Sequence, residues 1–438
     1  MISDWTTRTL GELTEFKSGK TPSKSNPEFW DGHIPWISAS SMHGNRYSYS
    51  KLRITDAAIK AGSIILDGNT ILLLVRGSTL HNRIPVGITT AKVTFNQDVK
   101  AIIPKDESVS PWFLLYWLMS KENELLGMVE NTGIGAGKLD TKVLKNLEIR
   151  IPTKHDQSKL IAFFKSIDDK IHLNHQINRT LESIAQAIFK SWFVDFDPVK
   201  AKMEGREPEG MDAKTASLFP DKLVESELGM IPEAWEVSSI ADVATVTKGK
   251  SYTSAELQVS DTVLVTLKSF QRGGGYRLDG LKEYTGKYKP EQVVYPGDLI
   301  VSYTDVTQKA ELIGRPAIVY ADGSYKTYVI SLDVGVVRPL EGGSMSKEYL
   351  FSLMNSDHFT QYTYSRSTGT TVLHLSKDAV PEFTFANPGG ELVSQLTKLI
   401  EPIFGQILLN HKESATLTEL RDTLLPKLIS GEIQIPTE

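Results

Sequence analysis

The chain of 438 residues contains no cysteine. This absence excludes disulfide bonds, a thiol nucleophile and any metal site built from cysteine ligands. The chain also has no uninterrupted run of about 18 apolar residues, the length that a transmembrane helix needs. The run from Ile71 to Val75 has the length of a strand, and residues 1–5 lack the basic and apolar segments of a signal peptide. We therefore expect a cytoplasmic protein with no membrane partner.

Nucleotide-binding motifs are missing too. Gly-Lys-Thr at 19–21 and Gly-Lys-Ser at 249–251 look like the end of a P-loop. That motif needs a glycine five residues before its second glycine, but Thr14 and Ala244 occupy those positions. The Gly-Ile-Gly-Ala-Gly-Lys segment at 133–138 fails because Leu139 replaces the Ser or Thr that would bind magnesium. We expect no NTPase site in this chain.

Signatures of methyl transfer, dinucleotide binding and metal binding are absent as well. The chain has no Asn-Pro-Pro-aromatic run, because Pro388 is followed by glycine, and no Rossmann fingerprint follows a strand. His33, His43 and His81 fit no metal template, and no carboxylate cluster accompanies them. We predict no catalytic residue, no metal site and no cofactor bound by this chain. A nuclease with an unrecognised metal site is the enzyme alternative.

The charge balance neither favours nor excludes nucleic acid as a partner. The formal net charge is −5, although residues 1–150 hold 18 Lys and Arg against 15 Asp and Glu, a balance of +3. A protein of net negative charge can still present a basic surface when its charges are segregated.

What the chain does contain is a long helical pattern that occurs twice, at about 156–193 and 392–429. Both copies include Leu-Asn-His, at 173–175 and 409–411, and the offset of 236 residues holds along the whole pattern. A fixed period across half of a chain indicates a duplicated unit.

The two patterns follow a heptad repeat, which is typical of a coiled-coil seam. Each seam turns polar near its middle, at Asn174 and Asn178 in the first copy and at Asn410 and Ser414 in the second. Antiparallel packing about a pseudo-twofold axis would bring these polar layers together and fix the register. Two unrelated amphipathic helices are the alternative, which the matched interruption disfavours. The predicted helix-core residues are Leu160, Ile167, Ile171, Asn174, Leu181 and Ile188, with Leu396, Ile403, Ile407, Asn410, Leu417 and Leu424; the alternating seam includes Ala185 and Arg421.

Two globular segments, 1–152 and 231–388, share landmarks such as Trp5 with Trp235 and the two Gly-Lys tripeptides. Within the first segment, 64–66 and 71–75 flank Asp-Gly and predict a hairpin. Residues 5–20 read as a short amphipathic element and 86–93 as one strand. Residues 111–126 predict one helix with Pro111 at its first position. We place long helices at 153–196 and 389–438, and a Pro-, Gly- and charge-rich connector with little core of its own at 197–230.

Basic, amide, hydroxyl and aromatic side chains interleave in the parts where the two segments differ. Arg, Gln, Asn and Lys can read base edges, while Ser, Thr and Tyr can hold phosphates. Ordinary solvated loops have a similar composition, so the pattern alone does not decide. The candidate DNA-contacting residues of the first segment are Lys20, Lys24, Ser38, Ser40, Arg46, Tyr47, Arg76, Ser78, Arg83 and Lys138. Those of the second are Lys250, Lys268, Gln271, Arg272, Tyr276, Arg277, Tyr303, Thr304, Lys309, Arg366 and Thr368.

Three stretches carry a resemblance to a known family. They are 19–37, which runs from Gly-Lys-Thr-Pro to Phe-Trp-Asp-Gly-His-Ile-Pro-Trp-Ile; 188–198, Ile-Phe-Lys-Ser-Trp-Phe-Val-Asp-Phe-Asp-Pro; and 424–433, Leu-Leu-Pro-Lys-Leu-Ile-Ser-Gly-Glu-Ile. Together with the duplicated order of globular segment and helix, they resemble the specificity subunit of Type I restriction-modification systems. The resemblance covers essentially the whole chain.

The resemblance implies an internally duplicated α+β fold, with two target-recognition domains joined and spaced by two long antiparallel coiled-coil helices. Each domain would read one half of a split site in double-stranded DNA. The family is non-catalytic: it guides two adenine-methylating modification subunits, which use SAM, and a restriction subunit that translocates DNA with ATP and Mg can join. A stand-alone sequence-specific or architectural DNA-binding protein is the alternative outside this family.

Overall fold

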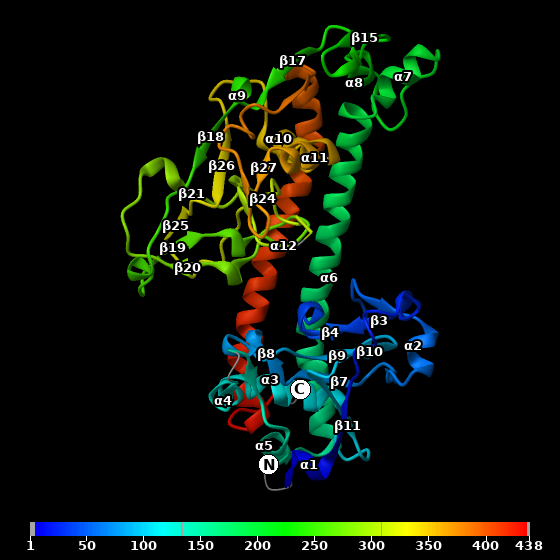
Figure 1. Cartoon of the computed structure of the whole chain (residues 1–438), viewed down its shortest axis with the longest axis vertical. Helices are drawn as coiled ribbons and strands as arrows, with labels where there is room; N and C mark the ends of the chain where they lie inside the picture. The colour runs from blue at the N-terminus through cyan, green and yellow to red at the C-terminus, as the bar shows by residue number, and fades with distance from the viewer. Residues whose placement is uncertain (1–4, 133–134, 308, 436–438) are drawn as a thin grey trace. The chain divides into compact units, whose positions relative to one another are not determined.

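The computed structural model describes residues 5–132, 135–307 and 309–435. The chain divides into two compact units, each assembled from segments that are distant in sequence. Unit 1 comprises Met1–Lys170 and Leu417–Glu438, and unit 2 comprises Ile171–Thr416. Two long helices, α6 (Lys154–Phe193) and α12 (Gly390–Ser430), contribute one part to each unit (Figure 1).

Unit 1 is a mixed α and β structure. Its helices are α1 (Leu10–Leu13), α2 (Asp56–Lys60), α3 (Pro111–Ser120), α4 (Glu122–Gly127) and α5 (Thr141–Lys145), besides its parts of α6 and α12. Its strands are β1 (Thr6–Thr9), β2 (Thr14–Ser18), β3 (Trp30–Ile37), β4 (Arg46–Tyr47), β5 (Arg53–Ile54), β6 (Ile65–Leu66), β7 (Ile71–Leu74), β8 (Arg76–Gly77), β9 (Val86–Thr89), β10 (Val93–Phe95), β11 (Val99–Pro104), β12 (Glu130–Asn131), β13 (Gly137–Lys138) and β14 (Glu148–Ile151).

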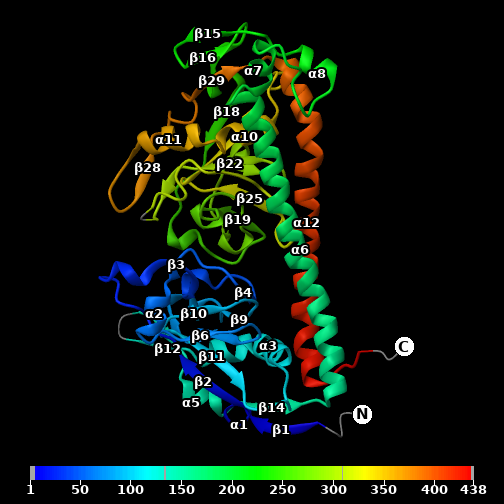
Figure 2. The same ribbon diagram turned by 90° about the vertical axis from the view of Figure 1, so that its right-hand side faces the viewer.

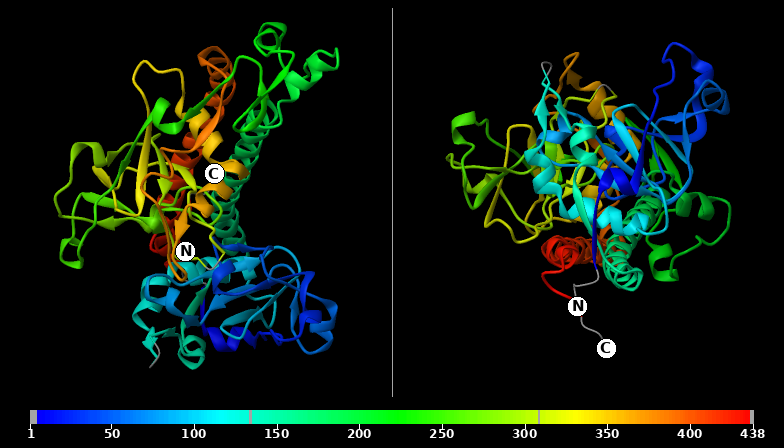
Figure 3. Two further views of the ribbon diagram at one scale, coloured as in Figure 1. Left: turned by 45° about the horizontal axis from the view of Figure 1, so that its top comes forward. Right: turned by 90° about the horizontal axis from the view of Figure 1, so that it is seen from below.

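These strands form four sheets, of orders β2-β11-β7-β9-β4, β5-β3-β10-β6, β12-β13-β8 and β1-β14. All four residues of β7 are buried, which explains why this strand reads as a continuous apolar run rather than an alternating one. The core also takes in Leu425, Leu428 and Ile429 from the end of α12, so the last turns of the chain complete unit 1. Figure 3 shows this part of α12 beside the first part of α6.

Several local expectations for unit 1 are wrong. Strands β6 and β7 do not pair with each other: β6 pairs with β10, and β7 lies between β11 and β9 in another sheet. The Asp-Gly turn therefore links two sheets, because burial of β7 on both faces outweighs the local hairpin signal. The predicted helix at 111–126 is interrupted between α3 and α4, residues 86–93 form parts of two strands, and residues 5–20 form β1, α1 and β2.

Unit 2 repeats this plan. Its short helices are α7 (Asp197–Met203), α8 (Ala213–Ser217), α9 (Ile240–Val243), α10 (Lys347–Met354) and α11 (Asp357–Ser365). Its strands are β15 (Leu223–Ser226), β16 (Gly229–Pro232), β17 (Glu236–Ser239), β18 (Ala244–Lys248), β19 (Thr262–Val265), β20 (Lys282–Glu283), β21 (Val293–Val294), β22 (Leu299–Ser302), β23 (Thr304–Asp305), β24 (Pro316–Ile318), β25 (Thr327–Ile330), β26 (Val334–Pro339), β27 (Ser367–Thr368), β28 (Leu373–Leu375) and β29 (Thr384–Asn387).

The duplication extends to individual hydrogen bonds. Sheets β18-β26-β22-β24, β20-β19-β25-β21, β23-β28-β27 and β17-β29 correspond to the four sheets of unit 1. The parallel pair of β3 with β10 has its counterpart in β19 with β25, while a second parallel pair, β4 with β9, belongs to unit 1. Helices α1 and α9 begin with the same capping box. The side chains of Thr9 and Ser239 cap the first turn, and the carboxylates of Glu12 and Asp242 accept from the backbone N–H of Thr9 and Ser239. Three backbone hydrogen bonds of unit 1 have counterparts in unit 2. The bond from Lys20 N–H to the Phe95 carbonyl corresponds to that from Lys250 N–H to the Ile330 carbonyl, and the bond from Asn96 N–H to Ile37 corresponds to that from Ser331 N–H to Val265. The third is the bond from Leu139 N–H to the Val75 carbonyl, which corresponds to that from Leu375 N–H to the Tyr303 carbonyl.

The connector at 197–230 has more core than its composition predicts. It forms α7, α8 and most of the β15–β16 hairpin, and Val199 and Phe219 are buried in the core of unit 2. The Phe219 ring meets Trp192 of α6 edge to face, with ring centroids 5.5 Å apart. Few apolar residues are enough here, because the end of α6 already offers a cluster of aromatic rings.

The paired helices confirm the antiparallel seam. Within unit 2, Asn174 lies next to Ser414 and Asn178 next to Ile407, so residue numbers rise along α6 as they fall along α12 (Figure 2). Of the predicted helix-core residues, Leu160, Ile167, Asn174, Leu396, Ile407 and Asn410 are buried, and Ile171, Leu181, Ile188, Ile403, Leu417 and Leu424 are half-buried. Near the end of α6 the fully buried residues include Ala185 and Phe189, in place of the predicted Leu181 and Ile188. A straight helix has about 3.6 residues per turn, so a seam with a period of about 3.5 residues gradually turns away from the core on which the helix also packs.

The polar layer meets as predicted. The Asn410 side-chain amide donates to the Asn178 side-chain oxygen at 2.7 Å, and the Asn174 amide donates to Ser414 Oγ at 3.3 Å. All four side chains are buried. Apolar substitutes in this layer would remove hydrogen bonds that can form in one register alone.

A histidine beside this layer makes unit 2 sensitive to pH. The His411 ring stacks on Tyr320, with centroids 4.2 Å apart and planes at 8°. Burial, and then the nearby His175, lower the pKa of His411 to about 4. The unfolded chain, with an ordinary histidine pKa, binds this proton more tightly than the folded one.

We expect unit 2 to lose stability as the pH falls from about 6.5 to 4, and to keep its full stability above that window. The full pKa shift of His411 corresponds to roughly 3 kcal/mol of unfolding free energy. Because the ring is only half-buried, we expect His411 to lower the unfolding free energy by about 2 kcal/mol. His411→Phe keeps a stacking ring without a titrating group and should flatten the curve. Urea unfolding of both proteins across this pH range measures the effect, and equal pH dependence would contradict it.

One helix among the described residues, α12, is long and apolar enough to cross a membrane by length and composition, with a mean hydropathy of 1.2 over 18 residues. A search for uninterrupted apolar runs misses such a segment. Leu396 and Ile400 belong to the core of unit 2, and Leu425 and Leu428 to that of unit 1. The two cores therefore bury part of the apolar surface of α12, and a single helix of this composition does not by itself indicate a membrane span.

Candidate nucleic-acid interface

Two candidate cations of unit 1 meet on the three-stranded sheet β12-β13-β8. Arg76 and Lys138 are direct cross-strand partners, and Arg76 also lowers the pKa of Lys100. Like charges placed opposite each other destabilise a sheet. Lys138 lies 3.8 Å from Glu130 and 3.9 Å from Asp140, which offsets part of this repulsion. Ser78 follows β8 and is exposed, so this sheet edge presents hydroxyl and cationic groups together.

Other candidates in unit 1 have structural partners. Tyr47 is 1% exposed, so it is a core residue rather than a surface contact. The Arg46 guanidinium donates to Asp169 of α6 at 2.5 Å, and that of Arg83 donates to the Met42 carbonyl at 2.9 Å. Lys24, Ser38 and Ser40 lie at the surface, with the two serine hydroxyls 3.0 Å apart.

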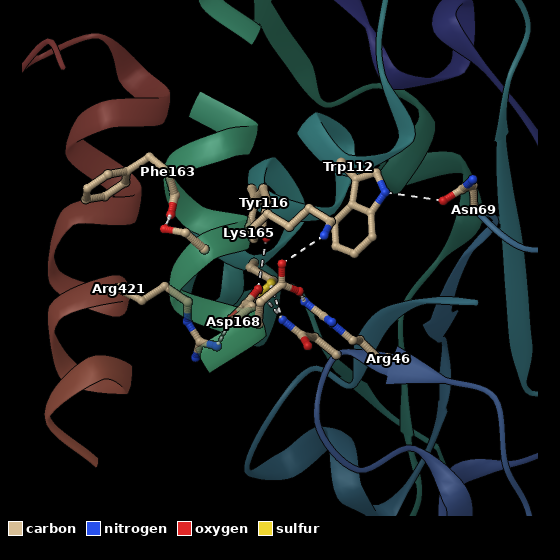
Figure 4. A network of polar contacts seen from close by, with 12 residues as sticks. Arg46, Asn69, Trp112, Tyr116, Phe163, Lys165, Asp168 and Arg421 are labelled. Carbon is tan, nitrogen blue, oxygen red and sulfur yellow. Dashed lines mark hydrogen bonds and ion pairs between the residues drawn. The ribbon is translucent and has the colours of Figure 1, made fainter. Parts of the chain in front are cut away.

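Arg46 belongs to a polar network centred on Asp168 (Figure 4). Asp168 is a buried residue, and its carboxylate accepts from Arg421 of α12 at 2.8 Å, from Asn45 at 2.7 Å and from Tyr116 of α3 at 3.0 Å. Burial and this carboxylate raise the pKa of Tyr116. Arg421 stands at a predicted seam position, and its charge is accommodated there because Asp168 faces it. The network fastens the globular part of unit 1 to both of its helix segments.

The candidates of unit 2 divide in the same way. Tyr276 and Tyr303 are buried, and Thr304 donates to Asp333 at 2.7 Å, so these three are structural. Burial raises the pKa of both tyrosines, which keeps them neutral. The side chains that remain at the surface, wholly or in part, are Lys250, Lys268, Gln271, Arg272, Arg277, Lys309, Arg366 and Thr368. Of these, Arg272 lies 3.8 Å from Glu311, and Arg366 lies 4.0 Å from Glu382.

The Gly-Lys tripeptides have a structural purpose. A Cβ on Gly19 would lie 2.2 Å from the Phe95 carbonyl oxygen, and one on Gly249 would lie 2.1 Å from that of Ile330. Only glycine permits this approach of two backbones. The following lysines, Lys20 and Lys250, donate to the carbonyls of Ala61 and Lys287, both at 2.7 Å.

Sequence patterns missed two lysines, Lys100 and Lys248, which lie inside strands and carry no motif. Only the cross-strand register shows that these two lysines occupy corresponding positions in the two units, and no local sequence pattern encodes that register. Among the residues that the structure describes, no group of three or more His, Asp or Glu side chains is arranged to hold a metal ion.

Comparison with known proteins gives consistent results. Residues 2–183 match the family model described as Type I restriction modification DNA specificity domain. Over 99% of its length the chain is 26% identical to the specificity subunit of Type I restriction enzyme MjaIX from Methanocaldococcus jannaschii, of which 94% is covered. The chain is thus similar, along nearly its whole length, to the specificity subunits of Type I restriction enzymes.

A second similar protein is the specificity subunit of the HindI enzyme from Haemophilus influenzae, which is 25% identical over 99% of this chain and the whole of that protein. Among solved structures, the S subunit of a Type I system from M. genitalium is similar, at 16% identity and a TM-score of 0.49, with 99% of this chain and 97% of that chain covered. The matched family model is described as a DNA specificity domain, and both relatives are named as specificity subunits of restriction enzymes.

Proposed function

We propose that this chain reads a bipartite site in double-stranded DNA, one half through residues 1–152 and the other through residues 231–388. The remaining segments do not read DNA in this proposal. They are the first long helix at 153–196, the connector at 197–230, and the second long helix with the C-terminal tail at 389–438. The observation that carries the proposal is the duplicated scaffold, which keeps its hydrogen bonds while its exposed polar side chains differ. A scaffold of this kind presents two different surfaces to two different sequences.

The helices support a spacing role. At 1.5 Å per residue, a helix of 40 residues such as α6 is about 60 Å long. Half-sites one DNA turn apart lie about 34 Å centre to centre. The interlocked asparagine layer fixes the register of α6 and α12, so the gap between the half-sites should be fixed as well.

The complex supplies the chemistry that this chain lacks. Two modification subunits carry SAM and methylate adenine, and a restriction subunit uses ATP and Mg. Exposed apolar side chains at the equivalent positions Leu173 and Leu409, 48% and 62% exposed, suit two equivalent subunits docking on the helices. The assembly works in the cytoplasm, where the host DNA is.

Long-read sequencing of DNA from cells that express the chain with its modification subunits tests the proposal. We expect methyladenine on a split motif, and its loss when the chain is deleted. Exchanging residues 231–388 for those of another family member should change one half of the motif, and exchanging residues 1–152 should change the other. A change in both halves from one exchange, or methylation that does not depend on the chain, would contradict the proposal.

A further inference from the structure

Both units place a lysine ammonium at the same point of the scaffold, but from opposite strands. In unit 1, Lys100 of β11 is the cross-strand partner of Ser18 at the end of β2. In unit 2, Lys248 at the end of β18 is the partner of Gly335 in β26. Ser18 and Lys248 each precede the glycine of a Gly-Lys tripeptide, so the two rungs correspond. Directly opposed residues point to the same face of a sheet, and both ammonium groups therefore lie on the same face.

Packing explains why the lysine changes strand. A Cβ on Gly335 would lie 2.6 Å from the ring of Tyr303, so the position equivalent to Lys100 has no room for a side chain. In unit 1 the residue corresponding to Tyr303 is the smaller Val75, as their matching backbone bonds show. Unit 2 instead supplies the charge from Lys248, whose ammonium lies 4.3 Å from the centroid of the Tyr303 ring. The two units therefore differ at three corresponding positions, yet each keeps one ammonium group at this point. The pairs are Ser18 and Lys248, Lys100 and Gly335, and Val75 and Tyr303.

Neither lysine is ion-paired with a carboxylate in the part of the chain that the structure describes. The Lys100 ammonium donates to the Ser18 hydroxyl, and Lys248 has the Tyr303 ring. Burial lowers the pKa of both lysines, although Asp98 near the first and Asp333 near the second oppose this effect. Partly desolvated cations without a carboxylate are poised to gain from an anion.

The surroundings of Lys100 favour the same kind of ligand. Arg76 is close enough to lower the pKa of Lys100, and Arg76 stands opposite Lys138 in the adjacent sheet. Glu130 and Asp140 offset the charge of Lys138, so the repulsion that a further anion would relieve is the one between Arg76 and Lys100. A phosphodiester, which is singly charged and rich in acceptor oxygens, has the chemistry that satisfies them.

We infer that Lys100 and Lys248 each hold a backbone phosphate of DNA and give the two recognition units an equivalent anchor that is independent of base sequence. Phosphate contacts position a protein on the duplex, while base contacts specify the sequence. An anchor at the same scaffold point would let the variable loops change their base contacts without changing the docking. This inference rests on the proposed function.

The test uses Lys100→Gln and Lys248→Gln, singly and together, in the full-length chain assembled with its modification subunits. Binding to cognate and unrelated duplexes is measured across a salt series. Loss of one charged contact should weaken binding to both duplexes about tenfold. The slope of log K against log salt should fall by about 0.9 per lysine, while the ratio of cognate to unrelated affinity stays the same.

Lys92→Gln is the matched control, because this lysine is 74% exposed and lies 3.9 Å from Asp67; it should change neither slope nor affinity. A second variant, Ser18→Lys with Lys100→Ser, moves the ammonium to the strand that carries it in unit 2 and should recover most of the affinity. Unchanged melting temperatures would show that the variants fold.

The outcomes separate the inference from the function. If the unaltered complex binds its site and methylates it while the glutamine variants keep the full salt slope, the phosphate anchors are disproved and DNA recognition stands. Loss of discrimination between cognate and unrelated DNA would also overturn the inference, because it would make the lysines base readers. A complete complex that binds no DNA would overturn the proposed function and the inference with it.

Discussion

Replacing Asp168 by alanine should destabilise unit 1 by about 3 kcal/mol, because it removes the buried counter-charge of Arg421 and leaves only the exposed Asp422. The carboxylate is 2% exposed and the arginine side chain 15% exposed, so water cannot replace the lost partner. Asn45 and Tyr116 lose their acceptor as well. Urea unfolding of the full chain measures the loss, and hydrogen exchange assigns it to residues of unit 1.

A matched control is available on the same arginine. Asp422 also pairs with Arg421 at 2.8 Å, but its side chain is 56% exposed. Asp422→Ala should therefore cost less than about 1 kcal/mol. The double change Asp168→Leu with Arg421→Met removes both charges and should recover most of the stability. Equal losses from Asp168→Ala and Asp422→Ala would show that the buried network is not what stabilises unit 1.

Gly249→Ala should destabilise unit 2 by about 1–3 kcal/mol or more, because the added methyl group overlaps rigid backbone. The new Cβ would lie 2.1 Å from the Ile330 carbonyl oxygen and 2.3 Å from that of Ser331. The Ile330 carbonyl accepts from the Lys250 N–H and the Ser331 carbonyl accepts from the Val334 N–H, so neither oxygen can move without disturbing these bonds. Gly19→Ala should have the same effect on unit 1. Denaturant unfolding with hydrogen exchange measures both losses.

Gly405→Ala is a control for which we expect a gain in stability rather than a loss. This glycine lies within α12, and a Cβ there would meet nothing within 4 Å. Alanine should stabilise the helix by about 0.5–1 kcal/mol through its higher helix propensity. If Gly249→Ala proved as harmless as Gly405→Ala, the close approach would not explain why both tripeptides begin with glycine.

The duplication, the two long helices and their polar layer could be predicted because they are periodic. A heptad seam is visible within one segment, and a shift of 236 residues shows that it occurs twice. The asparagines at 174, 178 and 410 then meet as expected, since helix geometry converts spacing into position with few alternatives. The family motifs are likewise local stretches of sequence.

The candidate site was less accessible to prediction, since composition cannot tell a surface tyrosine from a buried one. Tyr47, Tyr276 and Tyr303 all stand among polar neighbours in the sequence, yet each is buried. Arg46 looked like a base reader and instead pairs with Asp169, which is more than a hundred residues away. Such partners depend on contacts between distant segments, which neither spacing nor composition records.

By itself, then, the sequence determined the repeated architecture, the helix register and the family, because each of these is written in local or periodic patterns. Only the tertiary structure decided which strands pair, as β6 and β7 show by joining different sheets despite an Asp-Gly turn between them. It also decided that Lys100 and Lys248 occupy one place in two units. The physical reason is that strand partners and burial follow from packing across the whole unit, where the fit of a ring such as Tyr303 over Gly335 outweighs any local preference.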